Sequence, residues 1–116
     1  MFAIWVSVIF FLAAAVIGTN PLWSLIKKIP AKLKFVFIHG GLALTGLTLL
    51  IIGTTDTKSD VPILALITLV LTAMGGLMLF ALRRAKAPVP PGMAMLHPIF
   101  AIGGLILLFV FLFGNN

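Results

Sequence analysis

Four long runs of apolar residues, separated by short polar connections, constrain most strongly what this chain can fold into. They cover about residues 2–18, 35–53, 61–82 and 93–113. A helix needs roughly 20 residues to cross about 30 Å of hydrocarbon, with a range of about 17–25, and each run qualifies. In lipid, only a helix satisfies its backbone hydrogen bonds within one segment. The sequence therefore predicts an all-α integral membrane protein, a single transmembrane domain in which four helices form a bundle.

The amino-acid composition supports this prediction. Of the 116 residues, 62% are hydrophobic and only 9% are charged, whereas soluble domains carry about 25% charged residues. A chain of this size could not bury so much apolar surface by itself, so the lipid bilayer is its expected partner. The absence of cysteine excludes disulfides, thiolate metal sites and cysteine nucleophiles.

The first apolar run has the length of a secretory signal core, but its charges are in the wrong place. A signal peptide needs positive charge ahead of the core. Here only the N-terminal amine precedes it, and the nearest lysines, Lys27 and Lys28, follow it. We therefore expect residues 2–18 to be a span rather than a cleaved leader.

The basic residues indicate how the spans are oriented. Seven of the eight lie in the first and third connections, and the second connection holds Lys58 together with both acidic residues, Asp56 and Asp60. By the positive-inside rule, the first and third connections are cytoplasmic and both termini face outward. We expect a multi-pass plasma membrane protein, in bacteria the inner membrane. The net charge of +6 belongs to this asymmetry, so no nucleic-acid partner is expected.

Two further segments fit this orientation. Trp5 and Trp23 would lie near opposite membrane interfaces, where amphipathic aromatic rings are enriched. The segment Pro21–Lys34 is amphipathic, and we expect it to lie along the inner membrane surface before the second span begins.

The sequence also aligns with itself when it is shifted by 58 residues. Without a gap, residues 3–52 match residues 61–110, and 11 of these 50 pairs are identical. The chain's only two histidines, His39 and His97, fall at matching positions. Each repeat holds two spans, so both copies insert the same way up. This predicts two tandem helical hairpins related by a pseudo-twofold axis along the membrane normal, with both histidines at the same depth.

Two histidines at equal depth predict a shared ligand. An ionisable side chain within a span is costly and usually has a function. The ligand that fits best is one haem b per protomer, with His39 and His97 as the axial ligands of the iron. Both lie in the first turns of their helices, where the positive end of the helix dipole disfavours the imidazolium form. Neutral imidazole is the form that binds a metal.

Glycines and basic residues complete the predicted site. Gly46 and Gly104 lie seven residues after the histidines, hence on the same helix face, and leave room for a flat macrocycle. Gly18 and Gly76 lie near the inner ends of spans one and three and relieve crowding there. Positive side chains at the inner surface are expected to bind the haem propionates: Lys28, Lys34, Arg83, Arg84 and Lys86.

In this arrangement, the chain resembles the membrane-embedded b-type cytochromes that hold a haem between histidines of a four-helix bundle. The membrane anchor of succinate dehydrogenase is an example. The resemblance covers architecture and ligand placement only, through His39, His97, Gly46 and Gly104. It implies electron transfer with a quinone, an oxygen species or a partner protein. Many such cytochromes stack two haems on four histidines, and this chain has two histidines.

Other functions stay open at this stage. Small multidrug transporters need a carboxylate within the membrane, and these spans contain no Asp or Glu. No nucleophile, base and orienting group occur together, so any enzymatic chemistry, such as that of an oxidoreductase or redox subunit, would belong to the cofactor. The remaining alternatives are a haem-handling protein without turnover, a transport protein, or an accessory subunit whose histidines are structural. The glycine-rich faces of spans three and four also allow a homodimer.

Overall fold

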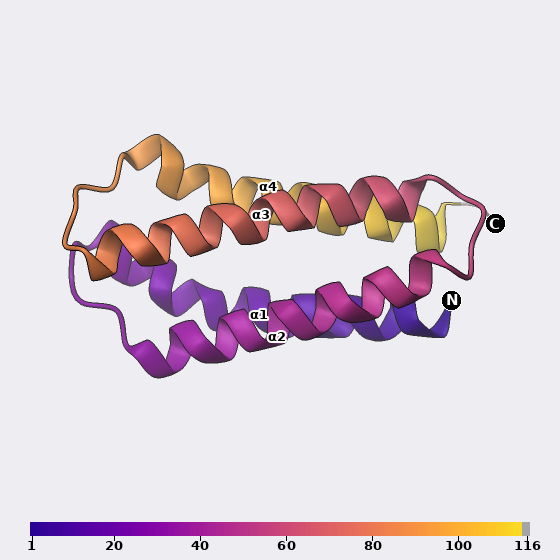
Figure 1. Cartoon of the computed structure of the whole chain (residues 1–116), viewed down its shortest axis with the longest axis horizontal. Helices are drawn as coiled ribbons and strands as arrows, with labels where there is room; N and C mark the ends of the chain where they lie inside the picture. Colours follow the sequence, from indigo (N-terminus) through magenta and orange to yellow (C-terminus); the bar gives the residue numbers. More distant parts are fainter. Residues whose placement is uncertain (115–116) are drawn as a thin grey trace. The chain divides into compact units, whose positions relative to one another are not determined.

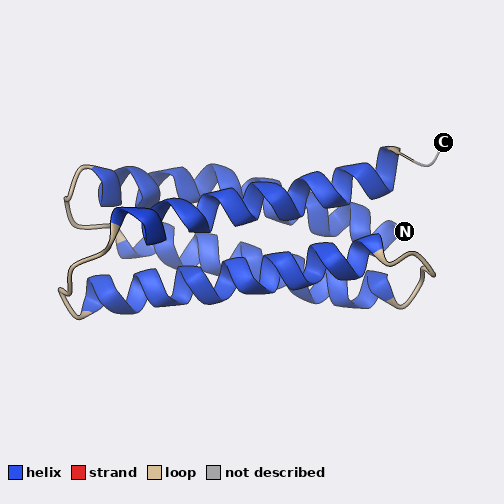
Figure 2. Cartoon of the chain, turned by 90° about the horizontal axis from the view of Figure 1, so that it is seen from above, coloured by secondary structure: helices blue, strands red, loops and turns tan. Residues whose placement is uncertain are grey.

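Four α-helices account for almost the whole of the described chain. The computed structural model describes residues 1–114 (Figures 1 and 2). Short loops connect the helices, whose bounds are α1 Phe2–Ile26, α2 Leu33–Thr54, α3 Val61–Arg84 and α4 Pro91–Phe113. The predicted all-α class and the number of helices are thus confirmed.

Each helix is long and apolar enough to cross a membrane. The shortest, α2, has 22 residues, which corresponds to about 33 Å at 1.5 Å per residue. Large apolar side chains point outward from the helices, and Phe2, Val16 and Leu77 are 82%, 69% and 69% exposed. Such outward apolar surface is suited to lipid rather than water. These features are those of a multi-pass membrane protein.

The helices extend beyond the predicted spans, most of all at the end of α1. Helix α1 continues through Gly18 and Pro21 to Ile26, so the predicted surface segment Pro21–Lys34 is not a separate element. Helix α4 begins at Pro91, two residues before the predicted start at residue 93, and contains Pro98. A proline inside a helix removes one backbone hydrogen bond and its ring crowds the carbonyl four residues earlier, yet α1 and α4 continue through Pro21 and Pro98.

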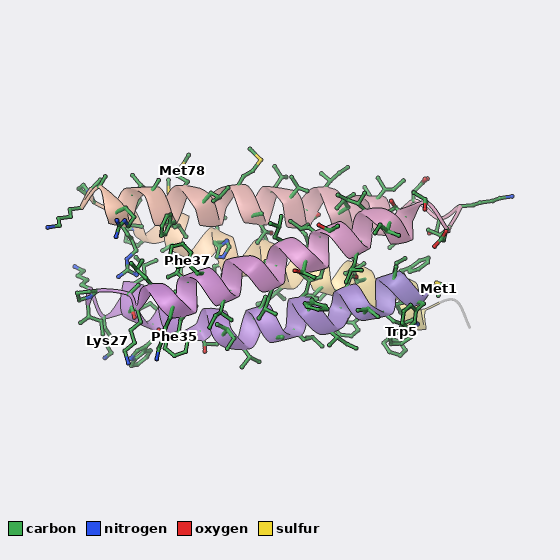
Figure 3. All side chains as sticks on the ribbon, turned by 60° about the horizontal axis from the view of Figure 1, so that its bottom comes forward. Met1, Trp5, Lys27, Phe35, Phe37 and Met78 are labelled. Carbon is green, nitrogen blue, oxygen red and sulfur yellow. The ribbon has the colours of Figure 1, made fainter. Side chains whose placement is uncertain are left out.

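The chain divides into two compact units, residues 1–58 and 59–116, and each contains one antiparallel helical hairpin. Helix α1 packs against α2 in the first, and α3 packs against α4 in the second. In Figure 3, Met1 and Trp5 lie at one end of the first hairpin, and Lys27 and Phe35 lie at the other. The basic first connection and the N-terminus are therefore at opposite ends of this hairpin.

Glycines and large side chains interlock along the first hairpin. Gly53 of α2 faces Ile4 of α1, and a Cβ atom built on Gly46 would lie 2.9 Å from the ring of Phe11. These contacts are seven residues apart on both helices, which is two helical turns and therefore one face. Ile4 and Phe11 are buried. The face of α2 that carries the glycines is thus the face that packs on α1.

The second hairpin has the same kind of contact between α3 and α4. A Cβ atom on Gly104 would lie 2.6 Å from Cγ of Leu69. Leu69 and Gly104 stand 58 residues after Phe11 and Gly46. Close approach of helices at small residues is the usual way in which membrane helices gain packing energy.

Candidate histidine site

His39 is the seventh residue of α2, and its ring packs directly on α1. Nδ1 of the ring lies 2.7 Å from the backbone oxygen of Ala14. The ring fills the space in front of Gly18, where an added Cβ would lie 2.7 Å from both Cε1 and Nδ1. His39 is half-buried and Ala14 is buried. Only a residue without a side chain at position 18 leaves room for this ring.

His97 is the seventh residue of α4 and makes the corresponding contacts with α3. Its Nδ1 lies 2.9 Å from the backbone oxygen of Thr72. A Cβ atom on Gly76 would lie 2.8 Å from Cε1 of the ring. Thr72 is buried, and its hydroxyl donates to the oxygen of Thr68 at 2.8 Å. Thr72 and Gly76 stand 58 residues after Ala14 and Gly18, as His97 does after His39.

These two hydrogen bonds fix the tautomer of each ring. A carbonyl oxygen accepts hydrogen bonds and does not donate, so Nδ1 must carry the proton. In a neutral imidazole, the lone pair then resides on Nε2. A backbone carbonyl bonded to one ring nitrogen is the usual means of orienting a histidine whose other nitrogen binds a metal. The donor chemistry of both rings therefore fits axial ligation of a haem iron through Nε2.

The structure brings the predicted glycines together with other residues of their own hairpins. Gly18 and Gly76 face the histidine rings, in line with their predicted role of relieving crowding. Gly46 and Gly104 are buried, and the space beside them is filled by Phe11 and Leu69. These contacts give all four glycines a packing role within the hairpins. They lend no support to the prediction that Gly46 and Gly104 border a macrocycle.

The predicted propionate partners lie at or just beyond helix ends. Arg83 and Arg84 are in the last turn of α3, and Lys34 is the second residue of α2. Lys28 and Lys86 lie in the turns that follow α1 and α3, and both are exposed. Nζ of Lys34 is 5.2 Å from the ring centroid of Phe35, within cation–π range.

Sequence reasoning missed the backbone acceptors of the two histidines. Every residue has a backbone carbonyl. Nothing in the sequence therefore distinguishes Ala14 and Thr72, whose carbonyls accept these hydrogen bonds, from other residues that pack between helices. One signal was nevertheless present, because a glycine stands 21 residues before each histidine. In an antiparallel hairpin with a short turn, that spacing places the glycine opposite the ring.

Comparisons with known proteins identify no relative of this chain. No protein family model matches it, and neither a curated protein nor a solved structure is significantly similar to it.

Proposed function

We propose that this protein is a membrane b-type cytochrome that binds one haem b per protomer between His39 and His97. The observation that carries the proposal is the pair of corresponding ring contacts. Each histidine is the seventh residue of its helix, and each Nδ1 donates to a carbonyl 25 residues earlier. A structural histidine needs no counterpart, whereas bis-histidine ligation needs two rings in the same tautomer, each presenting Nε2 to the iron.

The proposal includes the duplication inferred from the sequence. Helices α2 and α4 begin 58 residues apart, at Leu33 and Pro91, and α1 and α3 end 58 residues apart. Together with the matching histidine and glycine contacts, this spacing supports two tandem hairpins, residues 3–52 and 61–110. A pseudo-twofold axis along the membrane normal would then relate them and hold both histidines at one depth.

The number of ligands favours haem over a bare metal ion. Structural and catalytic zinc sites use three or four protein ligands. The chain has two histidines and no cysteine, and no group of three or more His, Asp or Glu residues in the described part of the chain could hold a metal ion. A porphyrin would bring its own nitrogen ligands for the iron, so His39 and His97 would be sufficient to hold it.

The same proposal orients the protein in the membrane. The first and third connections are cytoplasmic, both termini face outward, and the membrane is the plasma membrane, in bacteria the inner one. On this side, the haem propionates would meet Lys28, Lys34, Arg83, Arg84 and Lys86. The haem would supply one-electron redox chemistry, with a quinone, an oxygen species or a partner protein as the exchange partner and a homodimer as one assembly.

A second candidate function has its own support. Hydrogen bonds between membrane helices stabilise them by about 1 kcal/mol each, and each histidine already makes one such bond. The protein would then be an accessory, transport or haem-handling protein in which these residues clamp the hairpins.

Absorption spectroscopy of purified protein tests the cytochrome proposal. The protein is expressed with added haem precursor, purified in mild detergent, and measured before and after reduction with dithionite. We expect a sharp Soret band and split visible bands, with one haem per chain. A wild-type protein that is folded and colourless would contradict the proposal.

Conservative variants separate ligation from packing. In His39→Asn and His97→Asn, the side-chain amide can still donate to the carbonyl of Ala14 or Thr72 but is a poor iron ligand. We expect each variant to keep the helical circular dichroism of the wild type and to lose the bis-histidine spectrum. Retention of that spectrum in either variant would exclude the altered residue as a ligand.

A further inference from the structure

The turns that end α1 and α3 adopt an unusual backbone conformation with the same residue type in each. Lys28 has φ 57° and Lys86 has φ 56°, and no other non-glycine residue in the described chain has positive φ. The two lysines are 58 residues apart. Left-handed conformations are unfavourable for residues with a Cβ atom, and helices most often place glycine at this position.

Backbone hydrogen bonds hold each lysine in this conformation. After α1, the N–H of Lys28 donates to the oxygen of Leu25 at 3.2 Å, and that of Ile29 donates to the oxygen of Ser24 at 3.0 Å. This paired pattern is the Schellman motif, whose left-handed residue is the first one past the cap.

The turn after α3 has the same two bonds. The N–H of Lys86 donates to the oxygen of Arg83 at 3.1 Å, and that of Ala87 donates to the oxygen of Leu82 at 2.9 Å. In both turns, glycine would satisfy the motif without the steric cost of a Cβ atom. Strained left-handed residues concentrate at functional sites. Because glycine would suit the backbone better, the presence of lysine at both positions points to a function of its side chain.

The surroundings of both lysines are suited to an anion. The first connection also contains Lys27 and Lys32, the third follows Arg83 and Arg84, and neither contains an acidic residue. Both carboxylates of the chain lie in the second connection. Basic residues thus concentrate in and beside two connections whose sequences contain no Asp or Glu.

Aromatic side chains at the end of the first hairpin indicate the level of the lipid headgroups. Trp23 is 58% exposed, and Nζ of Lys27 lies 4.7 Å from the centroid of its ring. Exposed tryptophan with a neighbouring lysine is typical of the membrane–water interface. In a bilayer, the phosphate groups of phospholipids occupy this interfacial level.

We propose that each turn binds the phosphate of an anionic phospholipid, with Lys28 and Lys86 as the principal cationic ligands. Neighbouring basic residues add charge, and both lysines are exposed. The inference is independent of haem. Because the cytochrome proposal uses the same lysines for propionates, the test is made on haem-free protein.

Lipid binding to the full-length, haem-free chain in neutral detergent tests this inference. Native mass spectrometry compares phosphatidylglycerol with phosphatidylcholine of identical acyl chains. We expect the wild type to retain phosphatidylglycerol preferentially, and Lys28→Gly or Lys86→Gly to lower its affinity about fivefold each, because one basic residue near the surface contributes that much. Lys58→Gly, in the second connection, is the matched control and should leave the affinity unchanged.

Thermal unfolding shows whether the lysines serve binding rather than folding. Without lipid, Lys28→Gly and Lys86→Gly should melt at or above the wild-type temperature, because glycine fits the left-handed position. With phosphatidylglycerol, their melting temperature should rise less than that of the wild type. Lys28→Arg should keep the full rise. Unchanged phosphatidylglycerol binding in the double glycine variant, or an equal loss in Lys58→Gly, would overturn the proposal.

Discussion

At the scale of single residues, the two histidines are defined by what lies opposite them. A polar ring within a span needs a hydrogen-bond partner, and each ring here donates to a carbonyl across its own hairpin. That contact requires a glycine on the neighbouring helix. The position of each histidine ring therefore depends on the opposite glycine, and we expect a larger residue there to displace the ring.

Gly76→Ala and Gly75→Ala form a matched pair of variants on α3. A Cβ at position 76 would lie 2.8 Å from the His97 ring, whereas one at position 75 meets nothing within 4 Å. We expect Gly76→Ala to lower the free energy of unfolding by about 1–3 kcal/mol, since it overpacks the site. Gly75→Ala should not lower it, and alanine should raise it by about 0.5–1 kcal/mol as the better helix former.

Ring-nitrogen chemical shifts provide a second measurement for the same pair. In haem-free protein with ¹⁵N-labelled histidine, the wild type should show the tautomer with the proton on Nδ1 at both histidines. Gly76→Ala should alter the signal of His97 alone, because it disturbs the bond to Thr72. Equal effects of the two alanine variants would refute the role of Gly76.

The two histidines of the candidate site could be singled out from the sequence, but the groups that they contact could not. His39 and His97 were identified because they are the only histidines and fall 58 residues apart. The carbonyls of Ala14 and Thr72 could not be recognised as acceptors, because every residue type has a backbone carbonyl. Gly46 shows the same limit, because spacing placed it on the histidine's face but did not reveal that Phe11 fills the space beside it.

At the scale of elements, each hairpin is held by side chains that fit opposite glycines. The first hairpin pairs Phe11 with Gly46, and the second pairs Leu69 with Gly104. A seven-residue spacing keeps such contacts on one side of both helices. The packing energy of each helix pair therefore concentrates at a few interlocked positions.

A double-mutant cycle at Phe11 and Gly46 tests this packing. Gly46→Ala alone should cost about 1–3 kcal/mol, because its Cβ would lie 2.9 Å from the Phe11 ring. Phe11→Leu alone should cost about 3 kcal/mol or less, as a large side chain becomes smaller. In the double variant, we expect a favourable coupling of at least about 0.5 kcal/mol, measured by unfolding in detergent. Strict additivity would show that these residues do not share a contact.

Helix number and type were predictable from apolar run length, whereas two helix ends were not. The predicted first span ends at residue 18, but α1 continues through Pro21 to Ile26. The predicted fourth span begins at residue 93, but α4 begins at Pro91 and also contains Pro98. A proline removes one hydrogen bond, and in a long apolar helix the remaining bonds and the neighbouring helix are sufficient to hold the segment.

At the scale of the whole molecule, the chain consists of two compact hairpins, residues 1–58 and 59–116. Each has its own interlocked contacts and its own histidine. In the proposed topology, four consecutive membrane crossings would place connections one and three on one side of the membrane and connection two on the other. The positive-inside rule would make the first of these sides cytoplasmic.

Cysteine labelling measures this orientation directly, because the natural chain contains no cysteine. Thr55→Cys and Ala85→Cys place one exposed thiol in the second and third connections, respectively. In intact cells, a membrane-impermeant maleimide should label the first variant and not the second, and permeabilised cells should expose both. The reverse pattern would contradict cytoplasmic first and third connections.

The alternation of large and small residues along the first hairpin also prevents the two helices from slipping past each other. Phe11 of α1 opposes a glycine of α2, whereas seven residues later Gly18 opposes His39. A slip of two turns in one direction would push the Phe11 ring against His39, and a slip in the other would leave Gly18 facing Gly46 across a void. The observed alignment avoids both this collision and this void. The order of large and small residues along α1 and α2 therefore fixes the position of the His39 ring along the hairpin.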